Sequence, residues 1–377
     1  MKVKELSFTN YRNLTDGTIT PSENVNVIYG ENANGKTNLL EAVWLFCGGH
    51  SFRGSKENEM IRFDKDHFRL WMKFDSGERE QEAQIIFDKT RKLISINGVE
   101  KNSSSYLTEV FSAVVFSPEH LSLIKRGPNI RRKFLDAAIC QHRIRYASML
   151  AKYNQIINQR NALLKDIYKH PELKDTLSIW DDSLIEAGAR ILKERFEYLR
   201  QMKEPAREYH RGISSDKEEL SIEYLCTAKA TEDDSLDDIR GKLRREFSAS
   251  RHEDYRTGYT SVGPHRDDLD FKINGISARR FGSQGQQRSA VLSLKLSEAD
   301  LLYRKNGERP VILLDDVLSE LDNKRQDFLL NKVEDYQVFV TCCEESNKEQ
   351  LKRGKVFYIE NGVISEGNIC ISVKIPL

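Results

Sequence analysis

The sequence of 377 residues predicts an α/β fold of mixed sheets and flanking helices, interrupted by a second, helical domain. Three observations support this prediction. A β-rich run at Val25–Tyr29 leads through a glycine-rich loop into the helical pattern of Thr37–Phe46. Between about Arg131 and Phe247, glycine and proline become rare and amphipathic helical patterns dominate. From Tyr259 onward the sequence returns to loops and short apolar strands.

The N-terminal part alternates between strand and turn patterns. Val3–Phe8 alternates in the way that is typical of a strand, and Gly48-Gly49 ends the helix that follows the glycine-rich loop. Phe68–Ile96 predicts short strands joined by hairpins, with Asn97-Gly98 as the strongest turn signal. Val110–Phe116 predicts one more apolar strand.

The remaining elements divide the chain into three parts. The clearest helices are Arg143–Tyr168 and Leu177–Tyr209, and no sustained heptad repeat predicts a coiled-coil arm. A turn at Gly282–Gly285 begins a helix that extends to about Tyr303. We expect a first lobe at 1–130, a helical insertion at 131–258 and a second lobe at 259–377. The later strands are Val311–Leu314, Val338–Thr341 and Val356–Ile359, the last with a hairpin turn at Asn361-Gly362.

Composition and charge limit the class of protein. Apolar residues make up 39% and charged residues 31% of the chain, which is typical of a folded protein with a polar surface. The net charge of +1 gives no overall basic field, so any contact with DNA must come from a local patch. No signal peptide and no run of about 20 apolar residues is visible. We therefore expect a cytoplasmic protein that does not enter a membrane.

The six cysteines form no CxxC pair and have no accompanying histidine cluster, so the sequence does not predict a zinc site. Several lie in apolar runs, where a buried free thiol in a reducing cytoplasm is the simplest interpretation. The cysteines are Cys47, Cys140, Cys226, Cys342, Cys343 and Cys370.

A phosphate-binding P-loop pattern stands between the predicted strand and helix near the N-terminus. Its glycines allow backbone N–H groups to turn inward, and the helix N-terminus behind them favours an anion. Lys36 supplies a positive charge for the β- and γ-phosphates, and Thr37 supplies a hydroxyl for Mg²⁺. The alternative is a glycine-rich turn with an incidental lysine. The predicted ATP-binding residues of the loop are Gly30, Glu31, Asn32, Ala33, Asn34, Gly35, Lys36 and Thr37.

Two acids, Asp315 and Asp316, directly follow the apolar strand Val311–Leu314. A carboxylate at the end of a strand beside the P-loop can hold Mg²⁺, and a second one can orient and polarise the attacking water. We therefore predict Thr37 and Asp315 as metal ligands, and Asp316, Asp315 and Lys36 as catalytic residues. The alternative is a solvated turn, which two acids after a strand often form.

Ser283 and Gly285 precede the last long helix, where N–H groups and the positive end of the helix dipole attract a phosphate. On these residues alone, an ordinary N-cap by Ser283 with a polar surface is the favoured interpretation.

Six segments together resemble the RecF family of SMC-like, ABC-type ATPase heads. They occur in the family's order over nearly the whole chain, and the Gly-Pro-His-Arg-Asp-Asp and Ser-Gln-Gly-Gln-Gln-Arg runs are more specific than the P-loop. The segments are Phe8–Asn13, Gly30–Thr37, Phe116–Glu119, Val262–Asp268, Ser283–Arg288 and Leu313–Asp322.

The resemblance implies an ABC-type head and roles for individual residues. Asp315 corresponds to the Walker B carboxylate. Asp316 stands where ABC ATPases usually place glutamate as the general base, and a shorter acid fits slow hydrolysis. Arg12 is expected to touch the ATP phosphates, and Arg53 to line the same site or the DNA face. The signature residues, expected to reach the γ-phosphate held by the other subunit, are Ser283, Gln284, Gly285 and Gln286.

The resemblance also separates this chain from transporter ATPases. The strand Val338–Val340 leads into Thr341–Cys343 with no switch histidine, so the γ-phosphate sensor of transporters is missing. Ser319–Asp322 resembles the D-loop at a dimer seam. His265 and Arg266 are either structural or at the nucleotide interface, and the sequence does not decide between these roles.

Basic residues at the start of the helical insertion form a candidate DNA-binding surface. Each cation paired with a phosphate adds salt-dependent affinity. The alternative is a solvated helical face, and Asp136 is the only acid from Lys125 to Arg145. The predicted DNA-binding residues are Arg53, Lys125, Arg126, Arg131, Arg132 and Lys133, with His142, Arg143 and Arg145 in the same cluster.

The resemblance implies an ATP-dependent DNA-binding protein of gap repair and recombination, with ATP and Mg²⁺ as cofactors. ATP closes two heads into a homodimer that clamps DNA at gaps or single-/double-strand junctions, and the dimer is a weak, DNA-stimulated ATPase. RecR and RecO are the implied partners in loading RecA. The alternatives are a transporter ATPase subunit, which the missing switch histidine disfavours, and an SMC-type tether, for which the helical part is too short.

Overall fold

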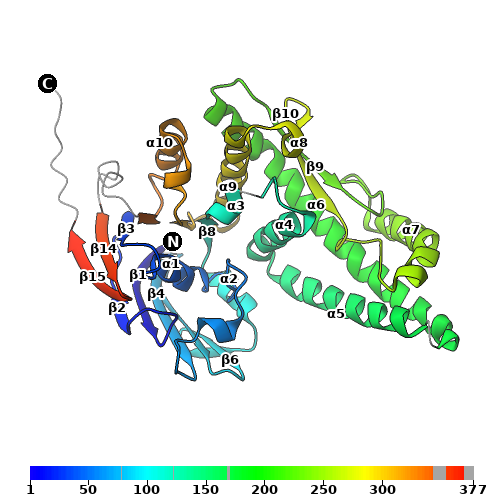
Figure 1. The fold of residues 1–377 in the computed structure, drawn as a ribbon, viewed down its shortest axis with the longest axis horizontal. Coiled ribbons are helices and arrows are strands. Elements are labelled where there is room, and N and C mark those ends of the chain that lie inside the picture. The colour runs from blue at the N-terminus through cyan, green and yellow to red at the C-terminus, as the bar shows by residue number, and fades with distance from the viewer. Residues whose placement is uncertain (78, 122, 168–169, 343–353, 369–377) are drawn as a thin grey trace. The chain divides into compact units, whose positions relative to one another are not determined.

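The computed structural model describes residues 1–77, 79–121, 123–167, 170–342 and 354–368 (Figure 1). The chain forms two compact units: the first unit is Met1–Leu121 with Lys295–Leu377, and the second unit is Ser122–Leu294. The predicted helical insertion lies within the second unit, which extends beyond 131–258 at both ends. The division of the chain into three functional domains at 1–130, 131–258 and 259–377 stays a prediction.

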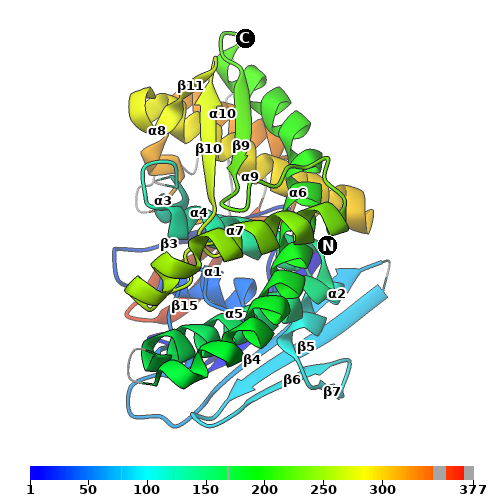
Figure 2. The ribbon, with the colours of Figure 1, turned by 90° about the vertical axis from the view of Figure 1, so that its right-hand side faces the viewer.

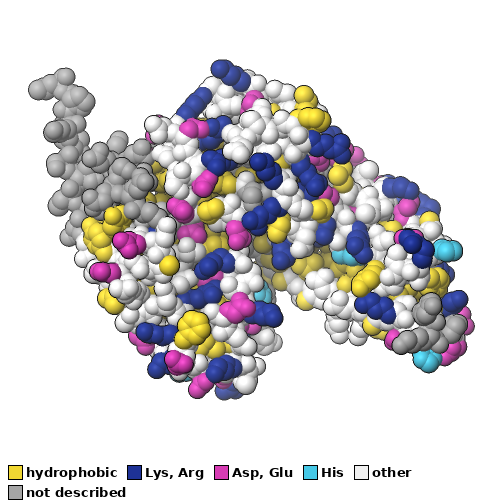
Figure 3. Space-filling view, in the orientation of Figure 1, with side chains coloured by type: hydrophobic (Ala, Val, Ile, Leu, Met, Phe, Trp, Pro, Cys, Tyr) yellow, Lys and Arg dark blue, Asp and Glu magenta, His cyan; other side chains and the backbone are white. Residues whose placement is uncertain are grey.

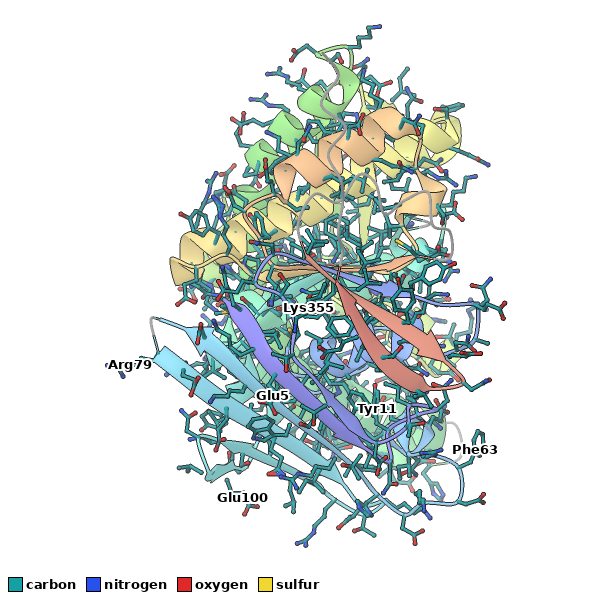
Figure 4. The ribbon with its side chains drawn as sticks, turned by 90° about the vertical axis from the view of Figure 1, so that its left-hand side faces the viewer. Glu5, Tyr11, Phe63, Arg79, Glu100 and Lys355 are labelled. Atoms are coloured by element: carbon teal, nitrogen blue, oxygen red, sulfur yellow. The ribbon has the colours of Figure 1, made fainter. Side chains whose placement is uncertain are left out.

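The first unit contains an antiparallel sheet in the order β2-β1-β4-β5-β6-β7. Buried and accessible residues alternate along β4, so one face of the sheet packs on the core and the other meets solvent. Figure 4 shows this sheet with its side chains, including Glu5 on β1 and Arg79 at the start of β5. The strands are β1 Lys2–Thr9, β2 Gly17–Ile19, β4 Phe68–Ser76, β5 Arg79–Phe87, β6 Lys92–Ile96 and β7 Val99–Lys101.

The other sheet of the first unit is mostly parallel, in the order β15-β14-β3-β13-β12-β8. Neighbouring strands from β14 to β8 run parallel, and β15 pairs antiparallel with β14 at the edge. The carboxyl ends of β3, β13 and β12 therefore meet at one edge, where ligands of such sheets commonly bind. The strands are β3 Val25–Tyr29, β8 Ala113–Phe116, β12 Val311–Leu314, β13 Val338–Cys342, β14 Gly354–Glu360 and β15 Val363–Asn368.

Helix α1, Lys36–Trp44, packs into the core of the first unit. Leu39 and Val43 belong to one hydrophobic cluster with inward side chains of both sheets, such as Leu70 and Leu313. Burying an aliphatic side chain of this size stabilises the fold by about 1.5–3 kcal/mol, so the cluster holds α1 against the sheets. The other helical elements here are η1 Glu57–Met60, η2 Ser104–Tyr106, α2 Leu107–Val110, α3 Pro118–Leu121, η4 Leu318–Glu320 and α10 Asn323–Lys332.

The second unit combines long helices with a small antiparallel sheet in the order β11-β10-β9 (Figure 2). Helix α6 contacts α5, α7 and β9. None of the helices in the described ranges has the length and apolar composition of a membrane span. Helix α9, Gln284–Asn306, begins in this unit and ends in the first. The other elements are α4 Pro128–His142, α5 Ile144–Ile167, η3 Pro171–Thr176, α6 Leu177–Ser214, β9 Leu220–Leu225, α7 Leu236–Thr257, β10 Asp268–Ile273, β11 Ile276–Ser277 and α8 Ala278–Phe281.

Two predicted elements differ from the structure. The prediction treated 131–247 as helical, but Leu220–Leu225 forms β9 and pairs with β10. This segment alternates apolar and polar residues, a strand pattern that the long helices on either side obscured. The strand predicted at 110–116 begins only at Ala113, because Leu107–Val110 closes a helical turn as α2.

Candidate functional site

The P-loop connects β3 to α1, and two of its glycines are sterically required. A Cβ on Gly30 would lie 2.3 Å from the carbonyl oxygen of Ile359 in β14. Gly35 has a φ of 112°, which favours glycine, and a Cβ there would lie 2.8 Å from atoms of Asn13 and Leu14. The loop can therefore follow this path only with glycine at both positions.

Lys36 is the first residue of α1, and its side chain folds back over the loop. Its Nζ donates to the carbonyl oxygens of Gly30 at 2.6 Å and Glu31 at 2.9 Å. The Nδ2 of Asn13 supports the loop by donating to the carbonyl oxygen of Ala33 at 3.1 Å. The ammonium group and the N-terminus of α1 together make this loop favourable for an anion.

A pocket of about 310 Å³ lies beside the loop at the carboxyl edge of the parallel sheet. Segments that are far apart in the sequence meet there, so the fold brings most of the loop together with both predicted acids. The residues that line the pocket are Asn32, Ala33, Gly35, Lys36, Thr37, Asn38, Arg53, Asp315, Asp316 and Thr341.

Asp315 is buried and links the P-loop helix to β13. Its Oδ1 accepts hydrogen bonds from Thr37 Oγ1 at 2.8 Å and from Thr341 Oγ1 at 3.2 Å. Burial raises the pKa of Asp315, and these two hydrogen bonds oppose that rise. A carboxylate and a hydroxyl this close together are oxygen ligands of the kind that a hard cation such as Mg²⁺ prefers.

Asp316 is the next residue, but its side chain is exposed. Its φ of 50° places it in the left-handed region, and its N–H donates to Thr341 Oγ1 at 2.8 Å. Ser319 Oγ lies 2.9 Å from both the carbonyl oxygen and Oδ1 of Asp316, and donates toward them. The hydroxyl of Thr341 therefore contacts both acids, and Ser319 orients the carboxylate of Asp316.

The two arginines predicted for this site occupy different places. Arg53 lines the pocket, and its Nη1 donates to Asn38 Oδ1 at 3.0 Å. Arg12 does not line the pocket, because its guanidinium donates to the buried carboxylate of Glu41 in α1 at 2.9 and 3.0 Å. Tyr11, labelled in Figure 4, donates to the same carboxylate at 3.1 Å. Arg12 thus supports the P-loop helix here, and its phosphate contact stays a prediction.

The signature residues begin α9 in the second unit. The Ser283 N–H donates to Gln286 Oε1 at 2.8 Å, and the Gln286 N–H donates to Ser283 Oγ at 3.2 Å. This reciprocal pair is a capping box, so Ser283 does cap the helix. Ser283 and Gln284 are exposed, and Gly285 follows within the first turn. The contact with a partner's γ-phosphate stays a prediction.

Two of the arginines predicted to bind DNA have partners within the second unit. Arg131 is buried, and its guanidinium donates to both oxygens of Asp268 at 2.7 and 2.8 Å. The prediction of Arg131 as a DNA-binding residue is therefore corrected, because its charge is held inside the fold. Arg132 donates through Nη1 to the carbonyl oxygen of Asp267 at 2.7 Å.

The other predicted cations of this segment are accessible. Lys125, Arg126 and Lys133 are exposed, and no carboxylate of a described residue lies within 4.0 Å of them. By contrast, the nearby Arg143 lies 3.6 Å from Glu194. The face of the second unit in Figure 3 carries many Lys and Arg side chains. We call Lys125, Arg126 and Lys133 the basic triad.

The segment that includes His265 and Arg266 has contacts within the second unit. His265 Nδ1 lies 2.7 Å from the Tyr153 hydroxyl, and its Nε2 lies 3.0 Å from the carbonyl oxygen of Thr260. Arg266 Nε donates to the same carbonyl at 2.9 Å. Burial lowers the pKa of His265 to about 4, so the ring is neutral at pH 7. These contacts favour the structural role over a role at the nucleotide.

Of the cysteines that the structure describes, Cys47 and Cys342 are buried, and Cys140 and Cys226 are half-buried. Burial raises the pKa of Cys140 and Cys226 to about 12, which keeps these thiols protonated and unreactive. Cys343 and Cys370 lie outside the described residues. Within the described ranges, no three His, Cys, Asp or Glu side chains gather into a metal-binding group.

Sequence reasoning missed two supports of the site, Thr341 and Glu41. Thr341 lies near the end of β13, between the strands that carry the P-loop and the acids, so its position in the sheet was the available signal. Glu41 is a fully buried acid in the apolar helix α1. A charged residue on a core-facing helix position implies a buried partner, which is Arg12.

Comparisons with known proteins agree with this geometry. The family model described as RecF/RecN/SMC N terminal domain matches residues 2–365. A DNA replication and repair protein RecF from Agathobacter rectalis is 40% identical over 97% of this chain and 99% of its own length. The solved structure of the recombination mediator protein RecF-ATPrS in the RecFOR pathway has a TM-score of 0.91 at 40% identity, covering 97% of both chains. An Smc head domain derived from Pyrococcus furiosus shares only the fold, with a TM-score of 0.54 at 14% identity over 98% of this chain and 96% of that chain.

Proposed function

The chain belongs to the RecF family, and from this premise we propose that it is an ATP-dependent DNA-binding protein of gap repair and recombination. ATP at the P-loop closes two copies of the chain into a dimer that clamps DNA. Slow, DNA-stimulated hydrolysis opens the dimer again. The protein acts with RecR and RecO to assist the loading of RecA.

The observation that carries this proposal is the 2.8 Å hydrogen bond between Thr37 and Asp315. It joins the P-loop to an acid that lies 278 positions further along the chain, at the edge where a nucleotide's phosphates would enter. A relative described as RecF-ATP in the RecFOR pathway, 40% identical, supports ATP as the nucleotide and RecO and RecR as partners.

The same two residues fit Mg²⁺. Asp315 is buried and its pKa is raised by that burial, so a cation beside it would favour the charged carboxylate. Thr37 and Asp315 would hold the ion, and bound nucleotide and water would complete its oxygen shell. When bound, Mg²⁺ neutralises charge that develops on the phosphates.

Hydrolysis depends on Lys36 and Asp316 in this proposal. The ammonium of Lys36 moves from the loop carbonyls to the β- and γ-phosphates and stabilises the charge on them. Asp316 accepts a hydrogen bond from the attacking water and orients it, while Ser319 fixes the carboxylate. Aspartate reaches less far than the glutamate of ABC ATPases, which supports a slow rate.

Dimerisation by ATP follows from the exposed N-terminus of α9. Ser283 and Gly285 at that N-terminus offer a hydroxyl and N–H groups to the γ-phosphate held by a second copy. Each P-loop then faces the partner's signature. Ser319–Asp322, directly after the acids, lies at the seam between the copies.

The basic triad supplies phosphate contacts for DNA in this proposal. Its three cations are exposed and have no carboxylate within 4.0 Å among the described residues, so DNA phosphates would not have to displace a partner. Arg53 lines the nucleotide pocket, and we assign it to the nucleotide rather than to DNA.

The decisive experiment is DNA binding by fluorescence anisotropy on gapped, single-stranded and duplex DNA, with ATP, with ADP and without nucleotide. We expect ATP to strengthen binding by at least about tenfold, with gapped DNA bound best, and DNA to raise the rate of ATP hydrolysis. If the chain neither binds DNA with ATP nor responds to DNA in hydrolysis, the proposal fails.

Alanine at all three positions of the basic triad refines the test. Each lost phosphate contact lowers the slope of log K against log salt by about 0.9. The matched control replaces Arg190, Arg244 and Arg256, which have carboxylate partners in the same unit, and should leave the slope unchanged. An unchanged slope in the triad variant would mean that DNA binds elsewhere on the chain. A transporter subunit or an SMC-like tether stays the alternative if the unsubstituted chain does not bind DNA with ATP.

A further inference from the structure

We propose that Glu218 is a positioning residue for the signature, through which the end of helix α6 sets the geometry of the first turn of α9. The inference rests on the proposed role of the signature in the ATP dimer. It adds a residue outside every motif that the sequence analysis recognised. All of its contacts lie within the second unit.

Glu218 follows the C-terminal end of α6 and precedes β9. The chain turns sharply between them, because Ser215 and Asp216 have φ values of 54° and 58°. The Glu218 N–H donates to Ser214 Oγ at 3.2 Å, so the turn is tied back to the last residue of the helix. The side chain of Glu218 is 23% exposed.

The carboxylate of Glu218 contacts the signature directly. Its Oε1 accepts a hydrogen bond from Gln286 Nε2 at 2.8 Å. The same side chain of Gln286 accepts from the Ser283 N–H through Oε1 at 2.8 Å. Glu218, Gln286 and Ser283 therefore form one continuous chain of hydrogen bonds from the end of α6 to the cap of α9.

This chain of hydrogen bonds fixes the orientation of the Gln286 amide. An ionised carboxylate only accepts hydrogen bonds, so the NH₂ group of Gln286 must face Glu218. The amide oxygen then necessarily faces Ser283 and completes the capping box. Without the carboxylate, the amide could rotate, and the turn that presents Ser283 and Gly285 would lose one of its two constraints.

A buried histidine, His210, lies next to Glu218 inside the unit. It lies on α6, is fully buried, and has its Nε2 3.2 Å from Glu218 Oε2. Its Nδ1 lies 3.5 Å from Ser293 Oγ, two turns further along α9. His210 therefore lies beside the second oxygen of Glu218 and also reaches α9.

The test replaces Glu218 by alanine and measures three quantities. We expect nucleotide affinity at the P-loop, measured with a fluorescent ATP analogue, to stay within about twofold, because that site lies in the first unit. We expect ATP-dependent dimerisation, measured by sedimentation, to weaken about tenfold, as the loss of a charged hydrogen bond would produce. Thermal unfolding reports whether the variant folds.

Glu219→Ala is the matched control. Glu219 is the adjacent residue, is 51% exposed, and pairs with Arg207 and Arg211 instead of the signature. It should dimerise like the unsubstituted chain. Glu218→Gln should restore most of the dimerisation, because its amide oxygen can still accept from Gln286. Gln286→Ala should weaken dimerisation at least as much as Glu218→Ala, because it removes both hydrogen bonds, and the double variant should be no worse than Gln286→Ala alone.

A Ser283→Arg variant separates this inference from the proposed function. If Ser283→Arg abolishes ATP-dependent dimers while Glu218→Ala dimerises normally, the positioning role is overturned and the proposed function stands. If Ser283→Arg also dimerises normally, the signature is not at the dimer interface, and both proposals fall. Equal losses in Glu218→Ala and Glu219→Ala would also overturn the positioning role.

Discussion

The pocket of the first unit and the polar network of the second unit, which consists of Arg195, Asp136 and Tyr224, both bring acids and cations together. They differ in the partners that these charged groups have. At the pocket, the ammonium group of Lys36 donates to loop carbonyls, and the side chain of Asp316 is exposed. A ligand could replace these contacts. In the second unit, the Arg195 guanidinium is 2% exposed and donates to Asp136, Tyr224 and a backbone carbonyl. Lys36 is buried as well, so the comparison teaches that the partner of a buried charge separates a ligand site from a structural network: Lys36 contacts neutral carbonyl oxygens, whereas Arg195 contacts a carboxylate.

The largest expected effect concerns the pocket. Asp316→Asn removes the proposed general base, so hydrolysis should fall by about 10²–10⁴-fold while the proposed metal ligand Asp315 remains. The variant should accumulate as an ATP-bound dimer, measured by phosphate release and light scattering. Hydrolysis at the normal rate would mean that Asp316 is not the base.

The next largest expected effect is a loss of folding stability when the buried ion pair between Asp136 and Arg195 is broken. Asp136→Ala leaves the buried Arg195 without its carboxylate, which should lower the free energy of unfolding by about 3–5 kcal/mol in chemical denaturation. Asp182→Ala is the control, since Asp182 pairs with Arg244 at the surface and should cost less than about 1 kcal/mol. Equal losses in both variants would contradict the comparison.

Lys36→Ala should weaken nucleotide binding and leave the stability of the fold almost unchanged, the opposite of what we expect for Asp136→Ala. Among the residues that the structure describes, the ammonium group of Lys36 donates to two loop carbonyls and to no carboxylate, so stability should change little. Nucleotide binding should weaken about 100-fold, and ATP-driven dimers should disappear, because the charge on the phosphates loses its partner. Light scattering that still detects ATP-driven dimers in this variant would contradict the model. Lys73→Ala, at the surface of the antiparallel sheet, is the control.

The smallest expected effect is a dependence of the unfolding free energy on pH, caused by His265 in the second unit. His265 has a pKa of about 4 in the folded chain and an ordinary value near 6.5 when unfolded, so its neutral form stabilises the fold above pH 6.5. That stability is lost progressively as the pH falls from about 6.5 to 4. His265→Gln should flatten this part of the curve of unfolding free energy against pH. An unchanged curve would show that other groups carry the dependence.

The strands and helices around the pocket could be predicted because local patterns carry them. The P-loop, the helix that follows it and the apolar strand before Asp315 each show their own periodicity or turn residues. Strand β9 was missed because its pairing with β10 is a contact between distant segments. The same reason hid Glu218, whose contact with Gln286 spans 68 positions.

The sequence also could not predict which basic side chains are exposed and which are held in ion pairs inside the fold. Arg131 and Lys133 are two positions apart on one helix, yet the first is buried beside Asp268 and the second is exposed. Helical periodicity places them on different faces, but only the packed structure shows which face meets Asp268. A run of basic residues therefore predicts a DNA-binding surface less well than a P-loop pattern predicts a phosphate-binding site.

The left-handed backbone at Asp316 bears on which acid can stand there. Asp316 has a φ of 50°. Among residues other than glycine, asparagine, aspartate and histidine are several-fold enriched in this left-handed region. The Thr341 hydroxyl holds the N–H of Asp316 in that conformation. The identity of the acid at this position is thus selected by chain conformation as well as by chemistry. Exchanging it for glutamate would trade reach toward the water for torsional strain, so a faster enzyme would require a different turn and not only a longer side chain.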